Sequence, residues 1–256
     1  MFKTLISTMD DKFLNRKLAL PFNHLIINQL VNKQTSDYQQ DNLISVMEKG
    51  LSKSRNRALE HCTSDIALIS DDDVEYVDDL EYIILKAFKE NPDADIITFQ
   101  VKTPDGEFFK DNYKDKSFYH NQKTIMRVSS VEIAFRVDKI KKNCIKFDED
   151  FGLGTNYPTG EEAILLSDAL KKGLKILYIP LPIVIHPKES SGGMFKNNPK
   201  LLEAKGAMFF RIFGLSGYFI SFLFAIKKYK MSNNSLLGFY KLMLQGIKEY
   251  KETNAK

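Results

Sequence analysis

The stretch ALISDDDVEY, residues 67–76, joins a run of apolar residues directly to three consecutive aspartates. The apolar part belongs to DIALIS, residues 65–70, which is typical of a strand buried on both faces. Carboxylates this close together repel one another unless a cation or cationic side chains hold them. In sheets of parallel strands, ligands bind beyond the carboxyl ends of the strands. The triplet therefore predicts a binding site at residues 71–73.

Short apolar segments alternate with segments of helical periodicity around this stretch. We expect strands at 3–8, 24–29, 65–70, 95–101 and 131–137, two more in KILYIP (175–180) and PIVIHP (182–187), and helices at 51–61, 77–90 and 161–172. Ser52 is the expected N-cap of the first helix. This alternation predicts an α/β domain with a largely parallel sheet flanked by helices.

The acidic triplet has the chemistry of a site for a hard divalent cation. Side chains two apart on an extended segment point the same way, so Asp71 and Asp73 are expected to face one ligand. Asp72 is then expected to point away or into the backbone network. Mg²⁺ and Mn²⁺ prefer oxygen ligands and are usually held by one or two carboxylates together with phosphates. The alternative is a solvated acidic loop that caps the helix beginning near Val77.

Three blocks of the sequence, in this order and spacing, resemble the inverting family-two glycosyltransferases. The first is GLSKSRNRALEHCTSDIALISDDDVEY (50–76), the second is FDEDFGLG (147–154) and the third is GEEAILLSDALKKGLKILYIPLPIVIHP (160–187). The family's pattern appears as Gly50, Ser52, Arg55, Asn56 and the Asp-x-Asp motif at 71–73. The resemblance covers roughly residues 3–190 and implies a GT-A fold, a Rossmann-like, mixed and mainly parallel sheet.

The resemblance also implies a reaction and a metal site. Members transfer a sugar from a nucleotide-diphosphate sugar to an acceptor hydroxyl, and a metal ion offsets the charge of the leaving diphosphate. We therefore expect a hexosyl- or N-acetylhexosaminyltransferase that uses Mn²⁺ or Mg²⁺. Asp73, Asp71 and His186 are the expected metal ligands. For His186, the alternative is a histidine packed at a strand end.

An inverting transfer needs a general base that removes the proton of the acceptor hydroxyl. Glu162 aligns with the family's base, and Glu161 is the close alternative. The family more often has Glu-Asp at this pair. A purely structural explanation also exists, because carboxylates in the first turn of a helix favour its dipole.

The remaining expected contacts are to the nucleotide sugar. They are Thr8, Gln29, Arg55, Asn56, Asp71, Asp72 and Lys188. Many family members have Asp-Asp-Gly-Ser after the second strand, where an aspartate recognises uracil, whereas this chain has IINQLVNKQTSD; Gln29 or Asn28 can replace that aspartate. Arg55 can alternatively be an exposed helical cation. Lys188 and SSGG (190–193) form either a flap over the diphosphate or an ordinary linker.

Basic and apolar residues gather in the C-terminal segment. Residues 196–256 contain 11 Lys/Arg and 3 Asp/Glu, although the net charge of the whole chain is only +4. Residues 212–226 contain no charge and are followed by Lys227, Lys228 and Lys230. This segment is shorter than the roughly 20 apolar residues that span a bilayer. We expect a catalytic domain at 1–195 and a basic, apolar helical tail at 196–256, bound to an anionic membrane surface or packed in a protein contact.

Together these features predict a metal-dependent transferase of a UDP-sugar in the synthesis of capsule, exopolysaccharide or O-antigen. Its acceptor is expected to be a saccharide that is linked to a lipid. The enzyme is expected on the cytoplasmic face of the inner membrane, because the N-terminus lacks the features of a secretory signal. No nucleic-acid recognition motif is present. One alternative is a nucleotidyl- or phosphoryl-transfer enzyme, although no phosphate-binding loop of the Gly-x-x-x-x-Gly-Lys type is present. The other is a catalytically silent GT-A domain that acts as a membrane-associated adaptor.

Overall fold

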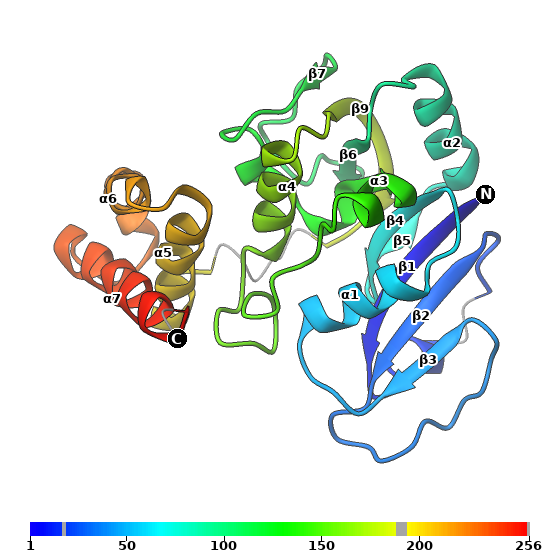
Figure 1. Cartoon of the computed structure of the whole chain (residues 1–256), viewed down its shortest axis with the longest axis horizontal. Helices are drawn as coiled ribbons and strands as arrows, with labels where there is room; N and C mark the ends of the chain where they lie inside the picture. The colour runs from blue at the N-terminus through cyan, green and yellow to red at the C-terminus, as the bar shows by residue number, and fades with distance from the viewer. Residues whose placement is uncertain (17–18, 188–193, 255–256) are drawn as a thin grey trace.

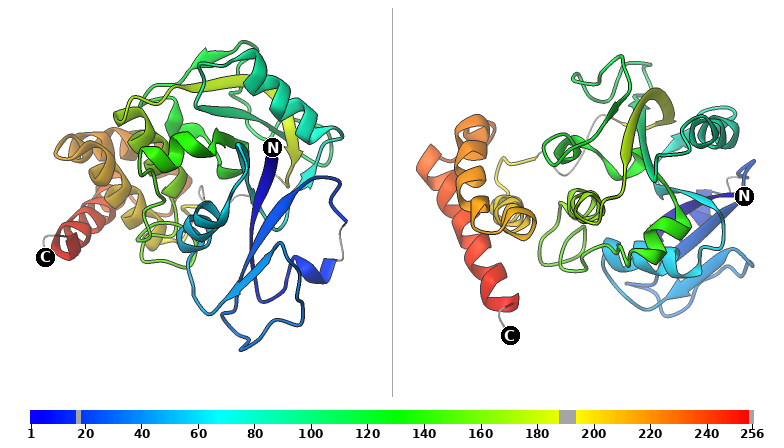
Figure 2. Two further views of the ribbon diagram at one scale, coloured as in Figure 1. Left: turned by 45° about the vertical axis from the view of Figure 1, so that its right-hand side comes forward. Right: turned by 45° about the horizontal axis from the view of Figure 1, so that its top comes forward.

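The structure is a computed structural model that describes residues 1–16, 19–187 and 194–254. A single large sheet lies at its centre, with helices on both faces and a helical tail beyond one of them (Figures 1 and 2). Lys188 and the SSGG segment, predicted as either a flap or an ordinary linker, lie outside the described residues.

Nine strands in the described part of the chain form this sheet, in the order β3-β2-β1-β4-β8-β6-β9-β5 with β7 paired to β9. They are β1 (Phe2–Met9), β2 (His24–Gln29), β3 (Leu43–Val46), β4 (Ile66–Asp71), β5 (Glu75–Tyr76), β6 (Ile96–Lys102), β7 (Phe118–Tyr119), β8 (Ile133–Arg136) and β9 (Ile176–Ile185). Strands β3, β2, β1 and β4 are mutually parallel, and the antiparallel β8 joins them to β6 and β9, which run in the same direction as β4. The predicted mixed, mainly parallel sheet is therefore confirmed.

The strand before the acidic triplet is buried on both sides, as its sequence predicts. Ile66 and Leu68 of β4 belong to the cluster on one face of the sheet, whereas Ala67 and Ile69 belong to the cluster on the other. Since both faces are covered, a continuous apolar run replaces the alternation of a half-exposed strand. This burial fixes the register in which β4 delivers Asp71 to the edge of the sheet.

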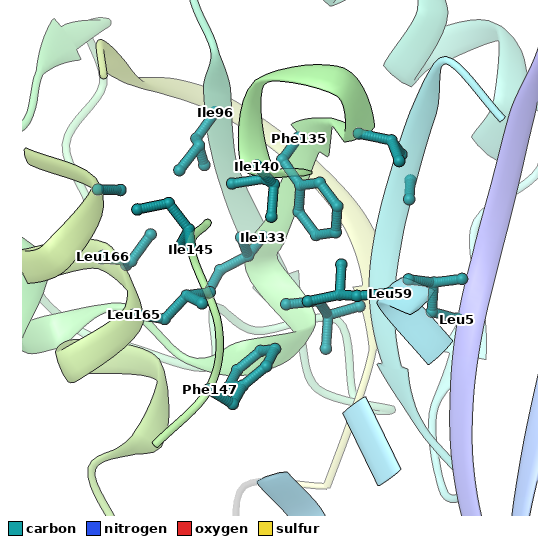
Figure 3. Close-up of a cluster of buried hydrophobic side chains, with 14 of the residues drawn as sticks. Leu5, Leu59, Ile96, Ile133, Phe135, Ile140, Ile145, Phe147, Leu165 and Leu166 are labelled. Carbon is teal, nitrogen blue, oxygen red and sulfur yellow. The ribbon is translucent and has the colours of Figure 1, made fainter. Parts of the chain in front are cut away.

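Helices cover the two faces unequally. The helices of this part are α1 (Leu51–His61), α2 (Leu80–Glu90), α3 (Val137–Lys142) and α4 (Glu161–Lys171), with 3₁₀ turns at Leu14–Arg16, Ile125–Arg127 and Ser130–Glu132. Side chains of α1, α3 and α4 pack on one face, around the cluster that Figure 3 shows, and α2 packs on the other.

Several local predictions were incomplete or wrong. The short strands β3, β5 and β7 and the helix α3 were not predicted, and the two strands expected at 175–187 are one continuous strand, β9. Helix α2 begins at Leu80 rather than Val77. The N-cap of α1 is Gly50, not Ser52, whose hydroxyl instead donates a 2.6 Å hydrogen bond to the carbonyl oxygen of Phe151. Ser52 thus ties α1 to the loop before α4.

The tail consists of α5 (Pro199–Phe213), α6 (Ser216–Lys228), a 3₁₀ turn (Tyr229–Met231) and α7 (Leu236–Asn254). It shares its apolar cluster with Phe151, Tyr157 and Ile164, which belong to the preceding loop and to α4. Figure 1 shows the three helices as a layer beyond α4, on the side away from β1–β3. Among the described residues, no helix is both long enough and apolar enough to cross a bilayer.

Two glycines let α5 and α7 cross backbone against backbone. A Cβ atom on Gly246 would lie 1.9 Å from the carbonyl oxygen of Glu203, and one on Gly206 would lie 2.0 Å from that of Met243. We expect Gly246→Ala to lower the free energy of unfolding by about 2–3 kcal/mol, because neither backbone can move without disrupting the cluster. Urea unfolding followed by circular dichroism measures this. The control is Gly238→Ala on the same helix, where the nearest neighbour of the new Cβ is a serine hydroxyl at 3.3 Å and no backbone atom is close. Equal midpoints for the two variants would contradict the prediction.

Candidate active site

The carboxyl ends of the parallel strands converge on one cavity of about 600 Å³. The ends of β1, β2 and β4 contribute to it, and so do the residues just before the antiparallel β8 and just after β9, because these lie at the same edge of the sheet. Most of the residues predicted from the sequence line it: Thr8, Gln29, Arg55, Asp71, Asp72, Asp73, Glu161, Glu162 and His186. The structure thus brings together residues up to 178 positions apart, from Thr8 to His186.

Each aspartate of the triplet has different partners. Asp71 accepts hydrogen bonds from Arg55 (2.8 Å) and Ser130 (3.3 Å). Asp72 was expected to point away from the ligand, but it lines the cavity and accepts a 2.8 Å hydrogen bond from the hydroxyl of Thr8. The strand ends at Asp71, so the alternation of side chains that underlies that expectation does not continue to Asp72.

Arg55 is a buried cation between two carboxylates. Its guanidinium donates to Asp71 at 2.8 Å and to Glu161 at 2.9 Å, and the side chain is 3% exposed. Although burial opposes the charge, Asp71 and Glu161 raise the pKa of Arg55 above its usual value. The alternative of an exposed helical cation is therefore wrong. Arg55 connects the end of β4 to the start of α4, and so fixes the distance between the acidic triplet and the glutamate pair.

The glutamate pair opens α4 directly after Gly160, whose φ of 96° suits glycine. Glu161 is held by Arg55. Glu162 lines the same cavity but is not part of that ion pair, and burial together with the neighbouring charge of Glu161 raises its pKa to about 7. The two adjacent carboxyl groups are thus distinct: one is ion-paired, and the other can take up a proton near neutral pH.

Lys205, on helix α5, places a cationic group beside this pair. Its ammonium lies 3.2 Å from the hydroxyl of Thr159, which also lines the cavity. Burial lowers the pKa of Lys205, whereas the charges of Glu162 and Glu161 act in the opposite direction. The tail therefore contributes a charge to the electrostatics of the site.

Asp73 and His186 form a further pair of side chains that line the cavity. The imidazole Nε2 lies 3.4 Å from Asp73 Oδ1, and Nδ1 lies 2.6 Å from the carbonyl oxygen of Pro187. The carboxylate of Asp73 raises the pKa of His186, and the imidazole in turn lowers the pKa of Asp73. A carboxylate and an imidazole form a suitable donor pair for a divalent ion whose other ligands come from phosphate.

No cluster of three or more His, Cys, Asp or Glu side chains with metal-binding geometry occurs within the described residues. Asp71, predicted as a third ligand, directs its oxygens to Arg55 and Ser130 instead. The residues present therefore fit a metal held by two protein side chains and a diphosphate, not a closed protein cage.

One further predicted residue, Asn56, does not line the cavity, and another, Lys188, is not described. Asn56 is buried, and its amide both donates to the carbonyl oxygen and accepts from the N–H of Phe147. The predicted nucleotide contact of Asn56 is therefore not made from this position, since the side chain braces the segment that leads to α4. Lys188 lies outside the described residues.

Other lining residues were not predicted. They include Lys12, Lys49, Phe109, Ser130, Leu153 and Thr159. Lys12 lies three residues after the end of β1 and 3.4 Å from Asp72, so its position after a strand end was an available signal. Ser130 was not identifiable in this way, because it precedes a strand whose antiparallel direction the sequence does not reveal.

The fold is similar to that of solved structures, and part of the sequence matches a family model. Residues 29–150 match the model of the family described as glycosyl transferase family 2. Among solved structures, the chain is similar to TarS 1-349 of S. aureus in complex with UDP-GlcNAc, with a TM-score of 0.64 at 12% identity over 98% of this chain and 80% of that one. For the TarS 1-349 structure whose description names no ligand, the TM-score is 0.58 at 14% identity, covering 99% of this chain and 73% of that one. For the TarS structure described without residue limits, the TM-score is 0.56 at 12% identity, covering 99% of this chain and 44% of that one. No curated protein matches the chain in sequence.

A mainly parallel sheet with an acidic run after a central strand and a glutamate pair across the cavity defines a GT-A glycosyltransferase. The match to the glycosyl transferase family 2 model covers just under half of the chain, residues 29–150, and agrees with the resemblance seen in its sequence.

Proposed function

We propose that the protein transfers a sugar from a UDP-sugar to a saccharide hydroxyl with inversion at the anomeric carbon. One observation carries the proposal. A single cavity is lined both by a carboxylate–imidazole pair, Asp73 and His186, and by a carboxyl group of raised pKa, Glu162. The first arrangement suits a departing diphosphate, and the second suits the deprotonation of an incoming hydroxyl.

The nucleotide is proposed to bind at the ends of β1 and β2. Thr8 and Gln29 line the cavity there, and Gln29 donates to the carbonyl oxygen of Gly50 at 3.0 Å. Asn28 is already engaged with Asp11 and Ser45, with its amide nitrogen 2.7 Å from Asp11 Oδ1. Gln29 is therefore the better of the two candidates for recognising the base.

Mn²⁺ or Mg²⁺ is proposed as the cofactor, with Asp73 and His186 as its protein ligands. When bound, such an ion offsets the negative charge that builds on the diphosphate. Lys12 and Arg16 place further positive charge beside Asp72: the ammonium of Lys12 lies 3.4 Å from its carboxylate, and Arg16 donates to its carbonyl oxygen at 2.5 Å.

Glu162 is proposed as the general base. It takes the proton of the acceptor hydroxyl as the oxygen attacks the anomeric carbon, and the bond to the diphosphate breaks on the opposite side of the sugar ring. Glu161 instead holds Arg55, and Arg55 holds Asp71, so this ion-paired chain positions the base relative to the donor.

The acceptor is proposed to be a lipid-linked saccharide used in capsule, exopolysaccharide or O-antigen synthesis, and the enzyme to lie on the cytoplasmic face of the inner membrane. The support for this location is the tail, which is basic and apolar. N-acetylhexosamine is the first donor sugar to test, because TarS has been solved with UDP-GlcNAc.

A donor panel tests the reaction. Incubated with UDP-sugars and Mn²⁺, the protein is expected to release UDP slowly from one of them, since water can replace the acceptor. Asp73→Ala should lower this release by about 100-fold or more, because an electrostatic contact to the leaving group is lost. Asp93→Ala, at an exposed aspartate in the loop between α2 and β6, is the control and should release UDP normally. Folded protein that releases UDP from no sugar would instead support the silent adaptor.

A further inference from the structure

In helix α6 the small side chains face the protein and large apolar side chains face solvent, which is the reverse of an ordinary surface helix. Its buried residues are Gly217, Ser221 and Ala225, all small and four apart. Its exposed face carries Phe219, which is 64% exposed, together with Phe222, Leu223 and Ile226, and Leu215 precedes it at 80% exposure. A helix that packs on a globular domain normally turns its large apolar residues inward.

The small side is needed because α6 lies close against α5. A Cβ atom on Gly217 would be 2.7 Å from the carbonyl oxygen of Phe209, so that nothing larger than glycine fits. Phe224 anchors the helix inward, with its ring 5.3 Å from that of Phe209 and 5.8 Å from that of Phe195. The outward phenylalanine Phe219 is thus not required for this packing, and its exposure leaves apolar surface in water that a partner would cover.

The apolar face continues onto the start of α7. The ring of Tyr240 packs edge-on against Phe222 at 5.3 Å, and its hydroxyl donates to the carbonyl oxygen of Tyr218. Leu237, one helical turn before Tyr240, is 74% exposed. Figure 1 shows α6 at the outer edge of the tail, against α5 and α7.

The charge around this face indicates what covers it. Between Glu203 and Glu249 the sequence contains no acidic residue, whereas Lys227, Lys228 and Lys230 follow the apolar face directly. A second copy of the chain, paired symmetrically through α6, would bring no carboxylate from residues 204–248 to meet these lysines. A bilayer with anionic headgroups offers both an apolar interior and the opposite charge.

We propose that α6 docks the protein on an anionic bilayer, lying flat in one leaflet with Phe219, Phe222 and Ile226 among the acyl chains. Lys227, Lys228 and Lys230 then lie at the phosphate groups. The helix has 13 residues, about 20 Å at 1.5 Å per residue, and is too short for a bilayer core of about 30 Å. The proposal identifies the surface that would hold the enzyme at its proposed place on the inner membrane. It does not depend on the chemistry of sugar transfer.

Co-sedimentation of the full chain with vesicles tests the proposal. The chain is expected to bind mixed phosphatidylglycerol–phosphatidylcholine vesicles, more weakly as salt rises and more weakly still with phosphatidylcholine alone. Phe219→Ser combined with Phe222→Ser should weaken binding by about tenfold or more, since it removes most of the aromatic area that enters the lipid. Replacing the three lysines by Gln should weaken binding to the anionic vesicles and leave binding to phosphatidylcholine almost unchanged.

Tyr82→Ser is the matched control, because Tyr82 is an aromatic residue of α2 with the same 64% exposure as Phe219. It should bind vesicles as the parent does. Vesicle binding that survives the double phenylalanine substitution would overturn the proposal, as would absence of binding by the parent. A parent that is dimeric and becomes monomeric in the double variant, without binding vesicles, would assign the face to a protein contact instead. UDP release in solution should be the same in the parent and in these variants, so that failure here leaves the reaction itself untouched.

Discussion

Replacing Glu162 by Gln should abolish sugar transfer while donor binding remains. The amide has the size of the carboxyl group but cannot accept the proton of the acceptor hydroxyl. Loss of a general base costs about 10²–10⁴-fold in rate. Because Glu162 is not one of the proposed metal and diphosphate contacts, Asp73 and His186, the affinity for UDP should change little. Product formation under single-turnover conditions and UDP binding by calorimetry measure the two effects separately.

Glu161→Gln is the matched control, since it makes the same change at the adjacent position. Glu161 accepts a hydrogen bond from Arg55, and an amide oxygen can still accept it. We expect a smaller loss of transfer than at Glu162. If Glu161→Gln abolished transfer and Glu162→Gln did not, the base would be Glu161 and the proposed roles would be exchanged.

The pH dependence of transfer gives an independent test of the same residue. Burial and the charge of Glu161 raise the pKa of Glu162 to about 7 from its ordinary 4.5. The base acts when deprotonated, so kcat/KM should rise with pH through about 7, and this rise should be absent from the residual activity of Glu162→Gln.

The raised pKa of Glu162 also makes the stability of the protein depend on pH. A group with a raised folded-state pKa stabilises the fold while it is protonated in that state. Its contribution is complete below 4.5 and is lost as the pH rises toward 7. The Gln variant should therefore be at least as stable as the parent at pH 8, which separates loss of chemistry from unfolding.

The parts of the fold that the sequence predicts are those with local signals. The bounds of α1 were predicted correctly, although its N-cap was not, because apolar and polar residues recur there at helical spacing. The strand β4 was predicted within one residue because its apolar run ends in the aspartates. The strand β8 was located only approximately, and its direction was not predicted, since direction depends on the connections between strands that are distant in the chain. Short edge strands such as β5, with two residues, are too brief to have a periodicity.

The same distinction applies to the site. The residue types that do the chemistry are recognisable, because an acidic run after a strand and a carboxylate pair at a helix start follow physical rules of position. The contacts among them are not local: Arg55 meets Glu161, and Lys205 approaches the pair from α5. The outward face of α6 is likewise invisible in composition, because no charged residue before Lys227 marks a solvent-facing side and only the packing on α5 shows which side is small.

The buried cation at the centre of the site should be as important for stability as for catalysis. Arg55→Met keeps much of the apolar volume but leaves Asp71 and Glu161 without their common partner. Removing one member of a buried ion pair typically costs about 3–5 kcal/mol, because the remaining charge is buried and unpaired. Asp71 is 29% exposed and is partly screened by water, so we expect the lower end, about 3 kcal/mol. Chemical unfolding monitored by circular dichroism measures the change.

A control on the same helix isolates the effect of burial. Arg57, two positions later, pairs with Glu48 at 3.1 Å, but its side chain is 36% exposed, so Arg57→Met should cost less than about 1 kcal/mol.

A triple variant tests whether the unpaired carboxylates cause the loss of stability. Combining Arg55→Met with Asp71→Asn and Glu161→Gln removes both of these charges. This should recover part of the lost stability without recovering transfer, since removing an uncompensated buried charge is favourable. If the triple variant were less stable than Arg55→Met alone, the guanidinium would contribute mainly by packing against its neighbours, such as the ring of Phe147 at 5.5 Å, rather than by holding the two carboxylates together.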